Sequence, residues 1–269
     1  MKEGFALPQA STQARAAGIA PVATIRRIGT ADLRAALREG WQDFRAIPTQ
    51  LIFLCILYPI VGLVAARAVS GGDLLPLLWP LIAGLSLVGP VAAVGLYEIS
   101  RRREAGEQVS WLTAFSVLRH PNLANIVMLG ILLMAIFVAW VGVAHWIWNT
   151  TIGELPVASL GDMADAAFTT PEGHRLLLLG NGVGFLFAVV VLVLTVVSAP
   201  MLIDRNVGIG PAIGTSIQAC LANPGPMALW GLIVAALLAI GSIPAFIGLA
   251  IVMPVLGHAT WHLYRRVVA

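Results

Sequence analysis

Long apolar runs alternate with short polar stretches along most of the chain. Six of these runs approach or exceed the roughly 20 residues that an α-helix needs to cross the hydrocarbon core of a bilayer. They lie at about residues 49–69, 74–97, 122–148, 176–199, 227–243 and 245–264. The pattern therefore predicts an all-α polytopic membrane protein with six transmembrane helices.

The connections between these runs predict three helical hairpins. The fifth and sixth runs form one apolar stretch of 38 residues, which is too long for a single crossing, and its turn chemistry is GSIP at Gly241–Pro244. Two arms therefore meet there, and they either span the bilayer or re-enter it. The three hairpins are expected at about residues 49–97, 122–199 and 227–264. We expect a flexible tail over residues 1–29 and a single membrane domain over residues 30–269.

Each predicted hairpin follows a segment with the apolar spacing of an amphipathic helix, and each segment ends at a proline. The prolines are Pro48, Pro121 and Pro224. The apolar faces consist of Leu33, Leu37, Trp41 and Phe44, then Leu112, Phe115 and Leu118, then Ile209, Ile213, Ile217 and Cys220. Such segments lie in the membrane interface with the apolar face against the acyl chains. The shared plan is either an internal repeat or a chance similarity among apolar segments.

The composition agrees with a membrane protein. Hydrophobic residues make up 59% of the chain and charged residues only 11%, and the mean hydropathy is +0.90, whereas about a quarter of the residues in a soluble domain are charged. The net charge of +3 does not indicate nucleic acid as a partner, because the basic residues flank apolar runs and do not form one patch with aromatic residues. The lipid bilayer, including its anionic lipids, is the expected partner.

The distribution of basic residues predicts the orientation. With both termini on one side, that side holds Lys2, Arg15, Arg26, Arg27, Arg34, Arg38, Arg45, Arg101, Arg102, Arg103, Arg119, Arg205, Arg265 and Arg266. The opposite side holds only Arg67 and Arg175. Because basic residues concentrate in cytoplasmic loops, the count of fourteen against two predicts that both termini are cytoplasmic.

The returning helices of the hairpins end in similar polar sequences. GPVAAVGLYEISRRR (89–103) and MPVLGHATWHLYRR (253–266) share Pro-Val, an aromatic residue seven positions after the proline, and an arginine pair. In this register His262 corresponds to Glu98, and His258 corresponds to Asp204 in APMLIDRNVG. If the helices end at equal depth around a shared axis, their polar residues meet. The predicted cytoplasmic-end polar cluster consists of Glu98, Arg101, Asp204, Arg205, His258, His262 and Arg265.

Catalytic and metal-binding patterns are weak. His258 and His262 share a helix face, as metal ligands can, but His145 and His174 fall toward the opposite surface, so a multi-histidine centre is not expected. We find no nucleophile elbow, phosphate-binding loop or paired catalytic carboxylates, and GNGVG (180–184) opens a membrane helix without a preceding strand. We therefore expect no metal, no cofactor and no enzymatic activity.

The connection at residues 149–175 predicts a short helix on the outer surface. In VASLGDMADAAF, Leu160, Met163, Ala167 and Phe168 fit one helical face. The other outer connections are very short, so this segment is the best candidate there for docking a partner. A solvated loop without a partner is the alternative.

Three stretches carry a family resemblance. They are LVGPVAAVGLYEISRRREAGE, LIDRNVG and LANPGPMALWGLIVAALLAIGSIPAFIGLAIVMPVLGHATWHLYRR. With them the sequence resembles, over about residues 25–266, the bacterial integral membrane family of unknown function called DUF2189. The resemblance implies a six-helix, multi-pass protein of the bacterial inner (plasma) membrane. It implies no reaction and no site residues.

These observations favour a non-catalytic inner-membrane protein that binds another membrane protein or complex, as an assembly or accessory component. The alternative is a transporter or channel for a small or lipidic solute, and a membrane enzyme ranks third. A deep hydrated cavity between the hairpins would favour transport. A flat apolar flank with helices lying along the lipid would favour the accessory role.

Overall fold

The computed structural model describes residues 23–47, 80, 89–153, 155, 160–243 and 247–269. Over these residues the protein is helical and contains no strand beyond a single bridging pair, which agrees with the predicted all-α class. The helices are α2 (Thr30–Ala46), α5 (Gly89–Ala92), α6 (Val94–Glu104), the 3₁₀ helix η3 (Trp111–Arg119), α7 (Leu123–Thr151), α8 (Leu160–Thr169), α9 (Pro171–Thr195), α10 (Ser198–Asp204), α11 (Ile209–Ala222), α12 (Pro224–Ser242) and α13 (Leu249–Val267).

Three helices among the described residues are long and apolar enough to cross a membrane. They are Leu123–Thr151, Pro171–Asp204 and Pro224–Ser242, with 29, 34 and 19 residues. They coincide with the third, fourth and fifth apolar runs of the sequence. The first predicted hairpin lies largely outside the described residues. Of it the structure describes Pro80 and the end at residues 89–97, in α5 and α6.

The sixth apolar run does form a helix, α13, but this helix is not among the three candidate spans. Its second half carries two histidines and two arginines, which lower its hydropathy, and Pro254 interrupts the backbone hydrogen bonds of its first half. Helix α13 also packs against α12, and a side chain at Gly248 would meet the backbone of Gly241 at 2.8 Å. The two helices therefore come close together at Gly241 and Gly248, on either side of the predicted turn, while the six-span layout is not confirmed.

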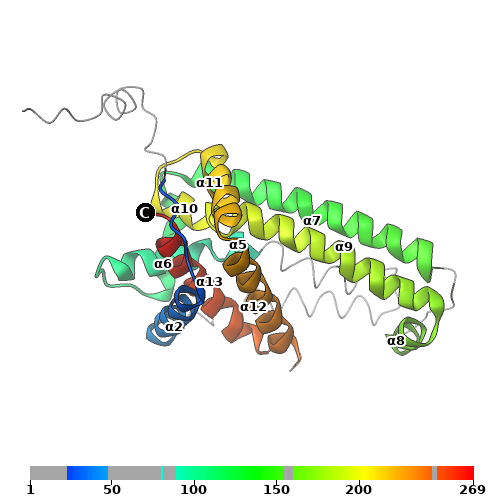
Figure 1. The fold of residues 1–269 in the computed structure, drawn as a ribbon. Coiled ribbons are helices and arrows are strands. Elements are labelled where there is room, and N and C mark those ends of the chain that lie inside the picture. The colour runs from blue at the N-terminus through cyan, green and yellow to red at the C-terminus, as the bar shows by residue number, and fades with distance from the viewer. Residues whose placement is uncertain (1–22, 48–79, 81–88, 154, 156–159, 244–246) are drawn as a thin grey trace, which may run out of the picture.

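Helices α7 and α9 run side by side as a long hairpin, with α8 at one end and α6, α10 and α13 gathered at the other (Figure 1). Trp140 of α7 is buried against Phe187 of α9, and their ring centroids lie 5.5 Å apart. Gly184 lets the Trp140 ring approach, since a Cβ there would lie 3.1 Å from it. The Trp140 indole donates to the carbonyl of Pro80 at 2.9 Å, so α7 also contacts the second arm of the first predicted hairpin.

A kink separates α9 from α10. Pro200 lacks a backbone N–H, and its ring clashes with the carbonyl four residues earlier, which breaks an α-helix. Helix α9 accordingly ends at Thr195 and α10 begins at Ser198. The free backbone N–H of Val197 donates instead to Ser216 Oγ of α11, at 3.2 Å.

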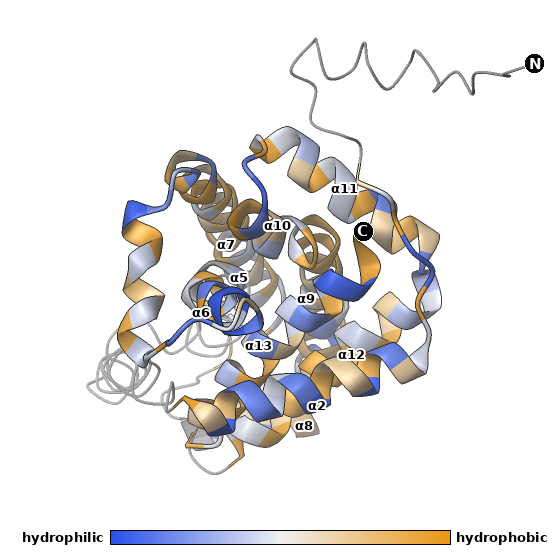
Figure 2. Ribbon diagram, turned by 90° about the vertical axis from the view of Figure 1, so that its left-hand side faces the viewer, coloured by the Kyte–Doolittle hydropathy of each residue, from blue (hydrophilic) through white to orange (hydrophobic). Residues whose placement is uncertain are grey.

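Two of the predicted interfacial segments, α2 and α11, run crosswise to α7 and α9, which are seen end-on (Figure 2). Helix α11 contacts both of them, whereas α2 packs on α13. In α2 the buried face differs from the apolar face read from the sequence. Leu33, Ala36, Gly40 and Asp43 are buried, whereas Trp41 is 45% exposed. The small residues explain the difference, because they let α2 pack closely on α13, where a Cβ at Gly40 would lie 2.5 Å from the Ala259 backbone nitrogen.

The segment before α2 is bound to the end of the chain. Ile25 bridges Val268 in antiparallel fashion, and the Arg26 N–H donates to the Val267 carbonyl at 2.8 Å. The Asn223 side chain fixes the same segment by accepting from the Ile28 N–H at 2.9 Å. Residues 25–28, within the stretch expected to be a tail, are therefore held against the C-terminal residues and Asn223.

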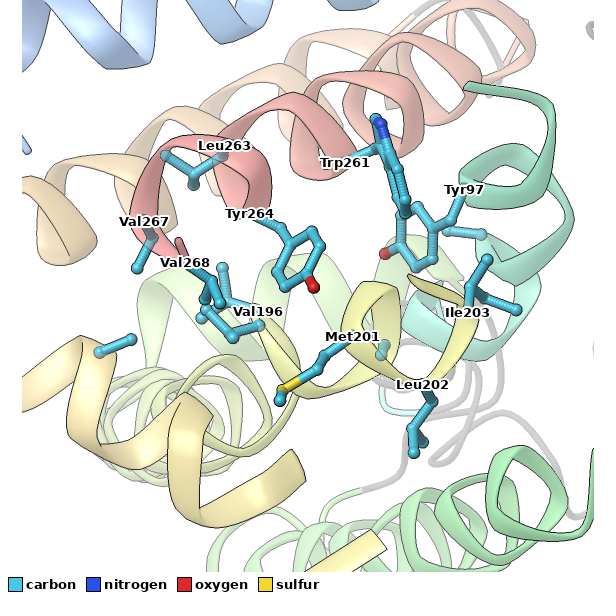
Figure 3. Packing of buried hydrophobic residues seen from close by; sticks show 14 of the residues in the cluster. Tyr97, Val196, Met201, Leu202, Ile203, Trp261, Leu263, Tyr264, Val267 and Val268 are labelled. Carbon is cyan, nitrogen blue, oxygen red and sulfur yellow. The ribbon is translucent and has the colours of Figure 1, made fainter. Parts of the chain in front are cut away.

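The main hydrophobic core lies where α6, α10 and α13 meet (Figure 3). Tyr97 of α6 and Trp261 of α13, the aromatic residues that match in the sequence register, both belong to this core and are almost fully buried. Tyr264 and Leu202 complete the contact between α13 and α10. We call this end of the bundle, where α2, α6, α10 and α13 come together, the polar end, because polar networks lie beside the core.

Candidate functional site

Asp43 lies at the centre of a network between α2, α6 and α13. Its carboxylate is 4% exposed. It accepts hydrogen bonds from Ser100 Oγ at 2.5 Å and from His262 Nε2 at 2.9 Å, and it forms an ion pair with Arg103. Three side chains from two other helices therefore converge on one carboxylate of α2, which ties this helix to the bundle.

The network continues from Ser100 to His258. His258 Nδ1 lies 2.7 Å from Ser100 Oγ, and both residues are fully buried. Ser100 has a single hydroxyl hydrogen, which it donates to Asp43, so the hydrogen in the contact with His258 must be on Nδ1. His258 Nε2 is buried without a hydrogen-bond partner, so the neutral Nδ1–H tautomer is favoured over a charged ring.

His262 connects the buried part of the network to the surface. Its Nε2 contacts Asp43, and its Nδ1 lies 3.3 Å from Glu39 Oε2. Glu39 in turn accepts from Arg266 Nη2 at 2.7 Å. A continuous chain of polar contacts thus runs from the partly exposed Arg266 to the fully buried His258.

Both carboxylates of this network are held in the ionised form. Burial alone raises the pKa of Asp43, but the hydrogen bonds from His262 and Ser100 outweigh it, and the pKa is lowered. The pKa of Glu39 is also lowered, mainly by the hydrogen bond from Arg266. An ionised Asp43 is the acceptor that the Ser100 and His262 contacts require.

A second group of polar residues belongs to α6. Glu98 is 1% exposed and accepts from Arg101 Nε at 2.8 Å and from Arg102 Nε at 2.5 Å, one helical turn away. Burial raises the pKa of Glu98, and the two guanidinium groups more than compensate, so the pKa is lowered. Arg102 Nη2 also donates to Ser116 of η3 at 3.2 Å, which joins η3 to α6.

A third group joins α6, α10 and α13. Asp204 accepts from the Tyr264 hydroxyl at 2.6 Å and from Arg265 Nη1 at 3.4 Å. Arg265 also donates through Nε to Glu104 Oε1 at 3.1 Å, and the same carboxylate accepts from Trp261 Nε1 at 3.0 Å. Arg205 lies 3.6 Å from Asp204 and donates to the carbonyl of Ala269.

The seven residues proposed from the sequence all lie at this end, but they do not form one cluster. Glu98 and Arg101 pair within α6, while Asp204, Arg205 and Arg265 form the third group, and His258 and His262 belong to the Asp43 network. Sequence reasoning missed Asp43 and Glu39, which bind His262, and Glu104, which binds Arg265 beside the predicted Asp204. Asp43 could have been suspected, because it follows Leu33, Ala36 and Gly40 at helical spacing.

The two histidines are committed to different partners. Both His262 nitrogens face carboxylates, and His258 contacts a serine. Within the described ranges no group of three or more histidine, cysteine or carboxylate side chains is arranged to hold a metal ion. The geometry is that of a structural polar network that joins helix ends.

The helical fold, three span-capable helices and outward-facing apolar side chains define an integral membrane protein. Residues 78–204 match the family described as predicted integral membrane protein (DUF2189), which confirms the family resemblance over this part of the chain. No curated protein and no solved structure matches the chain.

Proposed function

We propose that this protein is a non-catalytic, multi-pass component of the bacterial inner membrane that binds or helps to assemble another membrane protein. The observation that carries the proposal is the internal pairing at the polar end. The acids of the three groups are bonded to basic or hydroxyl groups of the same chain. Such groups fix helix ends and are not free to react with a substrate.

Burial supports the absence of catalysis. A general base must come within hydrogen-bond reach of the proton that it abstracts, whereas Ser100 and His258 are fully buried and bonded to each other. Elemental analysis of the purified protein should find no stoichiometric metal. A single metal per chain, lost in the His258→Ala/His262→Ala double variant, would contradict this proposal and favour an enzyme.

The charge distribution supports a cytoplasmic polar end. Arg101, Arg102 and Arg103 end α6, and Arg265 and Arg266 end α13. Basic residues beside membrane spans favour the cytoplasmic side. A reporter fused after Gly153 should read outside and one fused at the C-terminus should read inside, and the reverse pattern would contradict the orientation.

Helix α8 offers the face for a partner on the opposite side. It packs on α9 through Ala166 and Ala167, whereas Phe168 of the predicted apolar face is 70% exposed. Phe185 of α9 is a matched control, because it is 67% exposed on the flank of the long hairpin. A photo-crosslinking amino acid at position 168 should give a discrete protein adduct in cells, whereas position 185 should react with lipid.

Two outcomes would count against this docking face. Equal protein adducts at positions 168 and 185 would indicate nonspecific proximity. The absence of any protein adduct at position 168, with normal expression, would remove α8 as the docking site. Partners that remain bound after Met163→Ser/Phe168→Ser would do the same.

The transport alternative has less support in the described part of the chain. Two hollows there have volumes of about 390 and 350 Å³, and both open broadly to the surface. The first is a shallow apolar groove between α7 and α9 that includes Ala135 and Phe187. A solute pathway is expected to enclose its substrate, so these hollows favour the accessory role.

A further inference from the structure

Two sets of arginines, on α2 and at the ends of α6 and α13, have different surroundings. Those that end α6 and α13 pair with acids of the bundle. Those on the outer face of α2, namely Arg34, Arg38 and Arg45, are exposed and make no ion pair or side-chain hydrogen bond with any described residue. Their spacing places them on one face together with Trp41. This face of α2 therefore carries uncompensated positive charge.

A polar hollow lies at the end of this face. It has a volume of about 350 Å³ and is lined by Gln42, Arg45 and Ala46 of α2 and by Arg103 of α6. Arg103 is oriented by its ion pair with the buried Asp43, which engages Nη1. Its remaining N–H groups are free for a second acceptor, since a guanidinium carries five. Two guanidinium groups and one amide thus border the same hollow.

The hollow lies where the chain is predicted to pass into the bilayer. Helix α2 ends at Ala46, and the first apolar run begins at about residue 49. Trp41 and Phe44 stack near the same end with ring centroids 5.5 Å apart, and aromatic residues of this kind favour the interface between lipid and water. Helix α2 also runs crosswise to α7 and α9 (Figure 2). A ligand in the hollow would therefore be at headgroup depth.

We propose that this hollow binds the phosphate of an anionic phospholipid of the membrane leaflet at the polar end. Arg45 and Arg103 donate to the phosphate oxygens, as guanidinium groups favour, and the Gln42 amide donates to the headgroup. The Asp43 network then has a second effect, because it holds Arg103 in position for the lipid.

The test compares lipid retention among variants of the full chain purified in mild detergent. Native mass spectrometry would count phosphatidylglycerol and phosphatidylcholine bound from an equimolar mixture. The unaltered protein should retain one phosphatidylglycerol in preference to phosphatidylcholine. Arg45→Gln should weaken this retention roughly fivefold, because a basic residue at the membrane surface contributes about that factor. Arg45→Lys should recover much of it.

Arg34→Gln is the matched control. Arg34 lies on the same exposed face of α2 but outside the hollow, three turns from Arg45, so its loss should leave the retained lipid unchanged. Neither variant removes a contact of the Asp43 network, so both are expected to fold. Thermal unfolding in detergent would verify this.

Four results would overturn the proposal. Equal retention of phosphatidylglycerol by Arg45→Gln and the unaltered protein would show that the hollow is not the binding site. Retention of phosphatidylcholine by the unaltered protein at the level of phosphatidylglycerol would show that binding is not selective for anionic lipid. Displacement of the lipid by millimolar inorganic phosphate would indicate a site for free phosphate. Loss of a co-purifying protein in Arg45→Gln, with unchanged lipid, would indicate an acidic protein partner. None of these results depends on a partner bound at α8.

Discussion

The α7–α9 hairpin and the polar end are held together by different interactions. In the hairpin, outward side chains such as Ile131, Val138 and Leu186 are apolar and exposed, and contacts such as Trp140 with Phe187 hold the helices together. At the polar end, the buried Asp43 pairs with Arg103 and His262 from other helices. Lipid tails are as apolar as leucine, so association in the hairpin depends on packing. At the polar end, removing a partner of Asp43 leaves a buried charge behind.

This comparison teaches where the protein is sensitive to substitution. When an outward apolar side chain of the hairpin is truncated, the shorter side chain still faces lipid tails, so no polar group loses a partner. Truncating a member of the Asp43 network leaves groups without partners in a poorly solvated region. We expect destabilising substitutions to concentrate at the polar end.

The largest effect is expected for Asp43→Ala. This change leaves Arg103, His262 and Ser100 without their shared acceptor, and breaking a buried ion pair costs about 3–5 kcal/mol. Denaturant titration in mild detergent would measure the loss in the free energy of unfolding. Asp165→Ala, an exposed position on α8, should change this free energy by less than about 0.5 kcal/mol. Similar effects at both positions would break the comparison.

A smaller loss is expected for Gly40→Val. Its Cβ would lie 2.5 Å from the backbone nitrogen of Ala259, so α2 must move away from α13, and overpacking of this kind typically costs about 1–3 kcal/mol. Gly142 of α7 is the control, because nothing lies within 4 Å of a Cβ there. If Gly142→Val destabilised the protein as much as Gly40→Val, close contact between α2 and α13 would not be what holds α2.

Acid should weaken the polar end before it affects the hairpin. The pKa values of Asp43 and Glu98 are lowered in the folded protein, so their contribution to stability is present above their ordinary pKa of about 4 and is lost as the pH falls through the folded values. The midpoint temperature of thermal unfolding should therefore decrease once the pH is below about 4. The Asp43→Asn variant should have a lower thermal midpoint at neutral pH, and its midpoint should decrease less steeply with acid. An equally steep decrease in this variant would show that protonation of Asp43 does not cause the loss of stability.

The smallest effect is expected for Arg265→Gln. Arg265 connects Glu104 with Asp204, but its side chain is 41% exposed, and exposed pairs contribute only about 0–1 kcal/mol. The free energy of unfolding should fall within that range, and high salt should reduce the difference further. A loss as large as that of Asp43→Ala would show that exposure does not separate the two networks.

Local sequence determined the helices. The predicted third run at residues 122–148 corresponds to α7, and Pro224 and GSIP bracket α12. Apolar length, prolines and turn residues act over one helix at a time, so they can be read without knowledge of neighbours. The polar helix ends could be predicted for the same reason, and Glu98, Asp204 and His262 all lie at the polar end.

Tertiary structure alone decided which polar groups meet. Asp43 was not among the predicted cluster residues, yet it contacts Ser100, 57 residues away, and His262, 219 residues away. The register of α2 on α13 produces these contacts, because Gly40 permits a close approach that turns Asp43 inward. A hydropathy pattern records the free energy of single residues in lipid or water. It carries no information on which distant residue will neutralise a charge, because that depends on how helices pack.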